Sequence, residues 1–198
     1  MKDRNYALAG WFSIINAIVF APLMIFSLYM WQSRSSIPAG NILGSIADLI
    51  VAGLFAYTFY MFKILLKERY EFNSANIWIM ILIWVHILLA VTCILGKMIP
   101  GLENILAPVV TPAVIPIGIF HVILALVLLK LKEESPGHIK PFTITLLISG
   151  VCMILILTGL VWSTALVIFN LSSLISTIIA YVFLGIIFSR AKEGVEFV

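Results

Sequence analysis

Residues 77–99 read IWIMILIWVHILLAVTCILGKMI, an apolar run in which only Lys97 carries a full charge. As an α-helix rising about 1.5 Å per residue, this run is about 34 Å long. The hydrocarbon core of a bilayer is about 30 Å thick, so a helix of this length crosses it. The run therefore predicts a transmembrane helix, and its length and low charge give the criterion for finding others.

Five more runs meet that criterion, each bounded by charged residues, proline or glycine. The first of them follows Lys2 and Arg4 but is too long for a signal peptide, and no small-residue cleavage site follows it. We therefore predict an all-α bundle of six transmembrane helices that forms a single integral membrane domain over residues 1–198. The predicted spans are 7–30, 42–66, 77–99, 111–129, 142–161 and 171–189.

The composition of the chain supports this class. Apolar residues make up 63% of the sequence and charged residues 11%, against roughly 45–50% and about 25% in soluble domains. A soluble fold of this size could not bury so much apolar surface. The composition thus argues against a soluble globular domain, a nucleic-acid binder and a disulfide scaffold. Cys93 and Cys152 both lie within apolar runs, where cysteines usually serve as small packing residues.

The basic residues predict how the chain is oriented in the membrane. With six spans, ten of the twelve Lys and Arg residues fall on one side and two, Arg34 and Lys97, on the other. The positive-inside rule makes the richer side cytoplasmic. We therefore expect a multi-pass protein of the cell membrane with both termini in the cytoplasm. The ten residues are Lys2, Arg4, Lys63, Lys67, Arg69, Lys130, Lys132, Lys140, Arg190 and Lys192.

The ends of the even-numbered spans resemble each other. The segment 121–133 aligns without gaps to 181–193, with basic residues coinciding at two positions and an acidic residue at a third. This similarity suggests three repeated helical hairpins, at 6–69, 76–133 and 141–193, as in transporters built from parallel repeats. The competing interpretation is that any helix ending on the cytoplasmic side finishes with apolar residues followed by Lys or Arg.

Two histidines are the main candidates for function within the membrane. His86 lies about ten residues past the start of the third span, and His121 about ten residues before the end of the fourth. Ten residues of helix correspond to about 15 Å, so both imidazoles are expected near the midplane on consecutive helices. Ionisable groups at this depth face the bundle interior. The two rings are therefore expected to face one another or a shared cavity.

Three interpretations of this pair stay open. Each histidine can be a neutral polar group that hydrogen-bonds between helices. The pair can line a proton-linked or substrate-binding site in a small transporter or channel, with a small solute or ion as the ligand. Alternatively, His86 and His121 can be the axial ligands of a b-type haem. A metal site is not expected, because no further ligand lies nearby in the sequence.

Asp48 and Lys97 are both expected near the outer surface, where they can form an ion pair. As structure the pair would be an interfacial salt bridge of small net value. As function it would be an outer gate or recognition point on the pathway. The line formed by Ser45, Asp48, Ala52 and Ala56 predicts that the second span turns a small, polar face inward.

Three prolines stand four residues apart in the fourth span, at Pro108, Pro112 and Pro116. Each removes a backbone donor and crowds the carbonyl four residues earlier, so the outer half of this helix is expected to break or kink. Broken helices near the midplane are common at transporter sites. The alternative is that residues 101–111 form a loop or re-entrant segment and that Pro112 starts the helix.

No set of residues typical of an enzyme is present. The chain has no phosphate-binding loop, no metalloprotease helix motif, no nucleophile elbow and no pair of carboxylates in the membrane. We therefore expect a protein without enzymatic activity. The leading hypothesis is a transporter or channel with a polar cavity. The alternatives are a haem-binding membrane protein and a non-catalytic accessory subunit whose polar groups only pack.

Overall fold

The computed structural model describes residues 2–32, 38–99, 101–131, 139–156 and 163–192, and within them it contains six α-helices. Within these ranges, the structure describes only the backbone of residues 2–4, 21, 23–32, 38–41, 103–104, 107–114, 163–167 and 192. The helices are α1 (Lys2–Gln32), α2 (Pro38–Tyr70), α3 (Asn76–Met98), α4 (Leu102–Leu128), α5 (Ile139–Leu155) and α6 (Ser163–Lys192).

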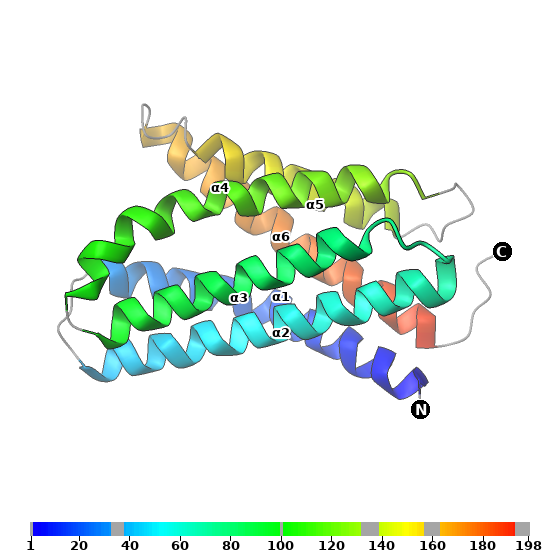
Figure 1. The fold of residues 1–198 in the computed structure, drawn as a ribbon, viewed down its shortest axis with the longest axis horizontal. Coiled ribbons are helices and arrows are strands. Elements are labelled where there is room, and N and C mark those ends of the chain that lie inside the picture. The colour runs from blue at the N-terminus through cyan, green and yellow to red at the C-terminus, as the bar shows by residue number, and fades with distance from the viewer. Residues whose placement is uncertain (1, 33–37, 100, 132–138, 157–162, 193–198) are drawn as a thin grey trace.

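The six helices form a closed ring. Each helix packs against its neighbours in the sequence, and α1 packs against α6 to close the ring. Figure 1 shows the helices lying along one long axis in alternating directions, so that α1 begins and α6 ends at the same end of the bundle. This end carries Lys67, Lys130 and Arg190, and we call it the basic end.

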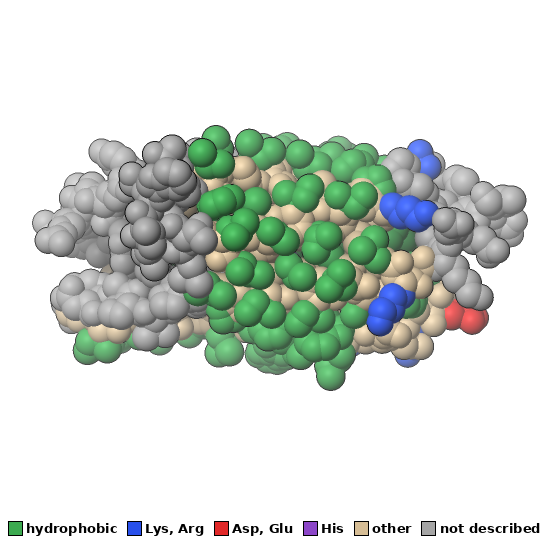
Figure 2. Space-filling model, turned by 90° about the horizontal axis from the view of Figure 1, so that it is seen from above, with side chains coloured by type: hydrophobic (Ala, Val, Ile, Leu, Met, Phe, Trp, Pro, Cys, Tyr) green, Lys and Arg blue, Asp and Glu red, His purple; other side chains and the backbone are tan. Residues whose placement is uncertain are grey.

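Three of the helices are long and apolar enough to cross a membrane: Ile42–Tyr70 in α2, Asn76–Met98 in α3 and Ile168–Ala191 in α6. The described parts of the other three helices contribute shorter apolar stretches. Figure 2 shows a broad band of apolar side chains around the middle of the bundle, with lysine and arginine side chains at one end. Exposed apolar surface of this extent needs an apolar solvent. The chain thus has the character of a multi-pass membrane protein.

A tight turn holds α2 and α3 antiparallel. Helix α2 ends at Tyr70, and the next residue, Glu71, adopts a left-handed conformation with φ of 50°. The backbone N–H of Phe72 then donates to the carbonyl of Leu66 at 3.0 Å, which satisfies an acceptor at the end of the helix. Because the connection is so short, α3 returns directly along α2.

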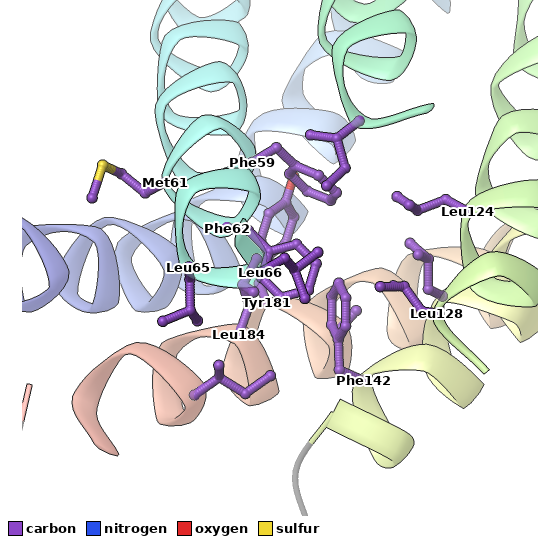
Figure 3. Close-up of a cluster of buried hydrophobic side chains, with 14 of the residues drawn as sticks. Phe59, Met61, Phe62, Leu65, Leu66, Leu124, Leu128, Phe142, Tyr181 and Leu184 are labelled. Carbon is purple, nitrogen blue, oxygen red and sulfur yellow. The ribbon is translucent and has the colours of Figure 1, made fainter. Parts of the chain in front are cut away.

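An apolar layer fills the ring near the basic end. Figure 3 shows side chains from α2, α4, α5 and α6 gathered there. The rings of Phe62 and Phe142 meet edge to face, with their centroids 5.1 Å apart. We call this cluster the apolar layer. It comprises Phe62, Leu66, Leu124, Leu128, Phe142 and Leu184, all almost completely buried.

Two pairs of glycines bring neighbouring helices close together. A Cβ added to Gly150 on α5 would lie 2.7 Å from the carbonyl oxygen of Gly118 on α4, and one added to Gly118 would lie 2.8 Å from that of Gly150. Gly10 on α1 and Gly185 on α6 approach each other in a similar way. Small residues at such crossings allow helices in a membrane to pack backbone to backbone.

Helix α4 starts before the predicted span 111–129, and the alternative of a loop or re-entrant segment over residues 101–111 is wrong. It begins at Leu102 rather than at residue 111, and it continues through Pro108, Pro112 and Pro116 to Leu128 without an interruption. Figure 1 shows that it bends along its length. Prolines four residues apart remove donors from one side of a helix only, so the intact opposite side can carry the helix through as a bend. The side chains of Pro108 and Pro112 lie outside the described residues, and Pro116 is exposed.

The gap-free alignment between α4 and α6 pairs buried positions with buried positions. Any two helices that face the same interior give this correspondence, so the duplication of a hairpin stays a prediction. Arg34, Lys132 and Glu193, which entered the charge count or the alignment, lie outside the described residues. The buried pairs are His121 with Tyr181, Leu124 with Leu184, Ala125 with Gly185 and Leu128 with Phe188.

Candidate functional site

His86 is held by its own helix and by an aromatic ring from α2. Its Nδ1 lies 2.9 Å from the carbonyl oxygen of Leu82, one turn earlier. A carbonyl only accepts, so this contact makes Nδ1 the donor and leaves Nε2 with a free lone pair. The ring of Phe55 stacks on the imidazole with a centroid separation of 3.8 Å and an angle of 14°. The antiparallel turn between α2 and α3 creates this contact.

His121 on α4 lies next to His86. The two ring centroids are 6.0 Å apart, with an angle of 36° between the ring planes. The structure therefore brings together the two histidines that the depth argument placed at one level. His121 is 4% exposed, and its Nδ1 has no hydrogen-bond partner. Buried polar atoms are nearly always paired, so this nitrogen is an unusual feature of the described core.

Counted along each helix from the basic end, a polar side chain of every helix falls within about two turns of the level of the histidines. Side-chain contacts connect neighbouring helices in this region: Phe12 of α1 packs on Tyr57 of α2, and Ser149 of α5 lies 2.9 Å from Thr177 of α6. Gly150, next to Ser149, faces the Cβ of His121. We call this level the central polar layer. Its members are Asn16, Thr58, His86, His121, Ser149 and Thr177.

Three members of the central polar layer keep unpartnered polar atoms. They are both amide atoms of Asn16, the hydroxyl of Thr58 and Nδ1 of His121. Asn16 and Thr58 are 0% exposed. Asn16 lies beside the Tyr181 hydroxyl, but neither amide atom forms a well-aligned bond with it. These side chains come from α1, α2 and α4. Outside this layer, buried polar atoms of Ser45, Tyr70 and Asn76 also lack a partner.

Asp48 and Lys97 form an ion pair between α2 and α3. The Lys97 Nζ lies 2.6 Å from an Asp48 carboxylate oxygen, and the two side chains are 21% and 15% exposed for Asp48 and Lys97 respectively. Gly44 lies against the Lys97 ammonium, where a Cβ would come within 3.2 Å of it. The pair lies on the far side of the histidines from the basic end, as the sequence predicted. The presence of this ion pair does not by itself indicate a function for Asp48 or Lys97.

We expect the substitution Asp48→Asn to destabilise the protein by about 2 kcal/mol, between the value of a surface pair and that of a fully buried one. The cause is the loss of the Asp48 carboxylate, which is the counter-charge of the mostly buried Lys97 side chain. The measurement is the melting temperature of the purified protein in detergent. The double variant Asp48→Asn/Lys97→Gln should recover most of the loss. Equal destabilisation by the single and double variants would show that the charge pair itself contributes nothing.

Polar contacts at the basic end join α1, α2 and α6. The Tyr6 hydroxyl donates to the Glu68 carboxylate at 3.0 Å. Arg69 donates to the carbonyl of Ala191 at 2.7 Å, near the end of α6, where a cation is favourably placed. These contacts and the apolar layer lie between the central polar layer and the basic end. In the described part of the ring, these packed side chains therefore separate the central polar layer from the basic end.

Sequence reasoning missed Phe55, Thr58 and Asn16 as parts of the site. The line containing Ala52 and Ala56 predicted a small inward face on α2, yet those two residues are only partly buried. The stripe containing Phe55 and Thr58 is buried instead. In a helix that is apolar on every side, periodicity does not identify the inward face. A phenylalanine spacing of three to four residues over 55–62 was the available signal.

Comparison with known proteins adds no family: no family model, no curated protein and no solved structure matches this chain.

Proposed function

We propose that this chain is a six-span protein of the cell membrane, with both ends in the cytoplasm, that conducts or transports a small solute through its bundle. In this proposal it performs no catalysis. The central polar layer contacts the solute, the Asp48–Lys97 pair lies at the outer mouth, and the bent α4 is the flexible element. The three hairpins are its repeating units.

Six spans are supported by the closed ring. Helices α2, α3 and α6 have spanning length and composition, and each of the other helices packs along at least one of these three. Helices that pack side by side with membrane-spanning helices in one ring lie in the same bilayer. The charge distribution of ten basic residues against two supports a cytoplasmic basic end.

The observation that carries the transport proposal is the buried, unpartnered His121 Nδ1 beside His86. A polar atom without a partner is costly in a membrane protein unless it meets water or a ligand. Non-helical or polar features at this depth are tolerated where they line a water-filled path. An interior that solutes enter supplies the missing partners of such an atom.

Cysteine accessibility tests the proposal without knowledge of the solute. In a background carrying Cys93→Ser and Cys152→Ala, we expect Thr58→Cys to react with the small uncharged reagent 2-hydroxyethyl methanethiosulfonate in intact membranes, as measured by protein mass. The matched control is Thr143→Cys. Thr143 is equally buried, but its hydroxyl already bonds to the carbonyl of Ile139, so it should stay unlabelled.

Failure of Thr58→Cys to react, in a variant that folds, would contradict a solute path through the interior. The polar side chains would then serve packing alone, as in a non-catalytic accessory subunit. Labelling of Thr143→Cys at the same rate would show general loosening rather than a path, and would also contradict the proposal.

A b-type haem remains the second candidate, because one observation favours it. The contact of His86 Nδ1 with Leu82 leaves Nε2 as the ligating atom, the arrangement usual for metal-bound histidine. His86 and His121 would hold the haem, which would supply one-electron chemistry. After expression with added haem, we expect no Soret band in the absorption spectrum. A band that is lost on His86→Ala and His121→Ala would replace the transport proposal with this one.

A further inference from the structure

We propose that the central polar layer binds a small, electrically neutral solute that both donates and accepts hydrogen bonds, a class that includes simple amides and polyols. This inference rests on the proposed function and names its substrate class. Three observations support it: the polar atoms without hydrogen-bond partners, the lack of charged side chains near them on α2 and α3, and the aromatic rings that lie beside Thr58.

The unpartnered atoms offer both kinds of hydrogen bond. The amide nitrogen of Asn16 donates and its amide oxygen accepts, while the hydroxyl of Thr58 does either. Nδ1 of His121 donates or accepts according to the tautomer. A ligand that satisfies this set needs donors and acceptors of its own, in the mixture that amides and polyols carry.

The surroundings disfavour an ion. Among the described side chains, α2 carries no charged residue between Asp48 and Lys63, and α3 carries none before Lys97. The nearest charges on these helices are Asp48 and Lys97, which neutralise each other at 2.6 Å. An ion in the central polar layer would lose its hydration without gaining a counter-charge, which is strongly unfavourable. A neutral solute avoids this cost.

An aromatic wall stands beside the polar atoms. The rings of Phe59, Phe55 and His86 stack in succession, with centroid separations of 4.4 Å and 3.8 Å. Phe55, Thr58 and Phe59 lie within one turn of α2, so the wall and the Thr58 hydroxyl share one side of that helix. Such a wall accommodates the carbon skeleton of a solute while the polar atoms bind its functional groups.

The experiment measures osmotic swelling of liposomes that contain the full chain, with acetamide and glycerol as neutral probes. Potassium and acetate flux are measured in parallel. We expect at least one neutral probe to enter faster than into protein-free liposomes, and neither ion to do so. Thr58→Val should lower entry of that probe about fivefold, the effect of losing one hydrogen bond between neutral groups. Thr143→Val, a matched change at a hydroxyl with a partner, should leave entry unchanged.

The possible outcomes separate this inference from the proposed function. Ion flux without entry of either neutral probe would overturn the inference and keep the transport proposal. Faster water flow with no entry of either probe would also overturn it, because the partners of the polar atoms would then be water alone. Equal effects of Thr58→Val and Thr143→Val would do the same. If Thr58→Cys also fails to react with the thiol reagent, the transport proposal fails with it.

Discussion

Replacing Gly150 by valine is expected to destabilise the protein by about 3 kcal/mol or more, the upper part of the range for overpacking. A Cβ at this position would lie 2.7 Å from the carbonyl oxygen of Gly118 and 2.9 Å from the Cβ of His121. Both atoms belong to or directly adjoin the backbone, so no flexible side chain can move aside. Helices α4 and α5 would have to separate.

The matched control is Gly53→Val on α2, where an added Cβ meets no atom within 4 Å. Both variants place the same side chain in a helix, so their difference isolates the helix crossing. We expect the melting temperature in detergent to fall sharply for Gly150→Val and to stay near that of the wild type for Gly53→Val. Similar melting temperatures for the two variants would show that α4 and α5 do not pack backbone to backbone.

Truncation of Leu124 to alanine is the second large effect, with an expected cost of about 2–5 kcal/mol, typical of a cavity in a packed core. Leu124 is fully buried, and Figure 3 shows its side chain in the apolar layer. Its neighbours come from several helices that lie on a closed ring, so they cannot collapse into the space without disturbing each other.

Leu126→Ala is the control for this prediction, because Leu126 lies on the same helix but is 51% exposed on the outer surface. Lipid or detergent fills the space left by its side chain, so little stability should be lost. The comparison uses the melting temperature and the fraction of monodisperse protein on size-exclusion chromatography. Equal losses for the two variants would place Leu124 outside the core, in conflict with the ring.

Much of the architecture is predictable from the sequence, because membrane helices must be long, apolar and internally hydrogen-bonded. Residues 77–99 predicted α3, which the structure extends over Asn76–Met98. The helices were predicted from the length and low charge of the apolar runs, and the common level of the two histidines from the helix rise. The outer part of α4 was not, because three prolines satisfy the criteria for a break, a loop or a bend, and the packing of neighbouring helices selects among them.

The candidate site was only partly predictable. His86, His121, Asp48 and Lys97 stood out because ionisable groups are rare in apolar runs. Their partners, Phe55 and Thr58, did not stand out because phenylalanine and threonine are ordinary in membrane helices. Charge and length in the sequence thus determined that the chain is a helical membrane protein with four ionisable candidates. Only the tertiary structure decided that the ring closes through α1 and α6. It also decided which polar atoms lose water inside the ring, and that Gly118 and Gly150 let α5 pack closely against α4 beside His121. The physical reason is that helices apolar on every side have no preferred face until they pack against one another.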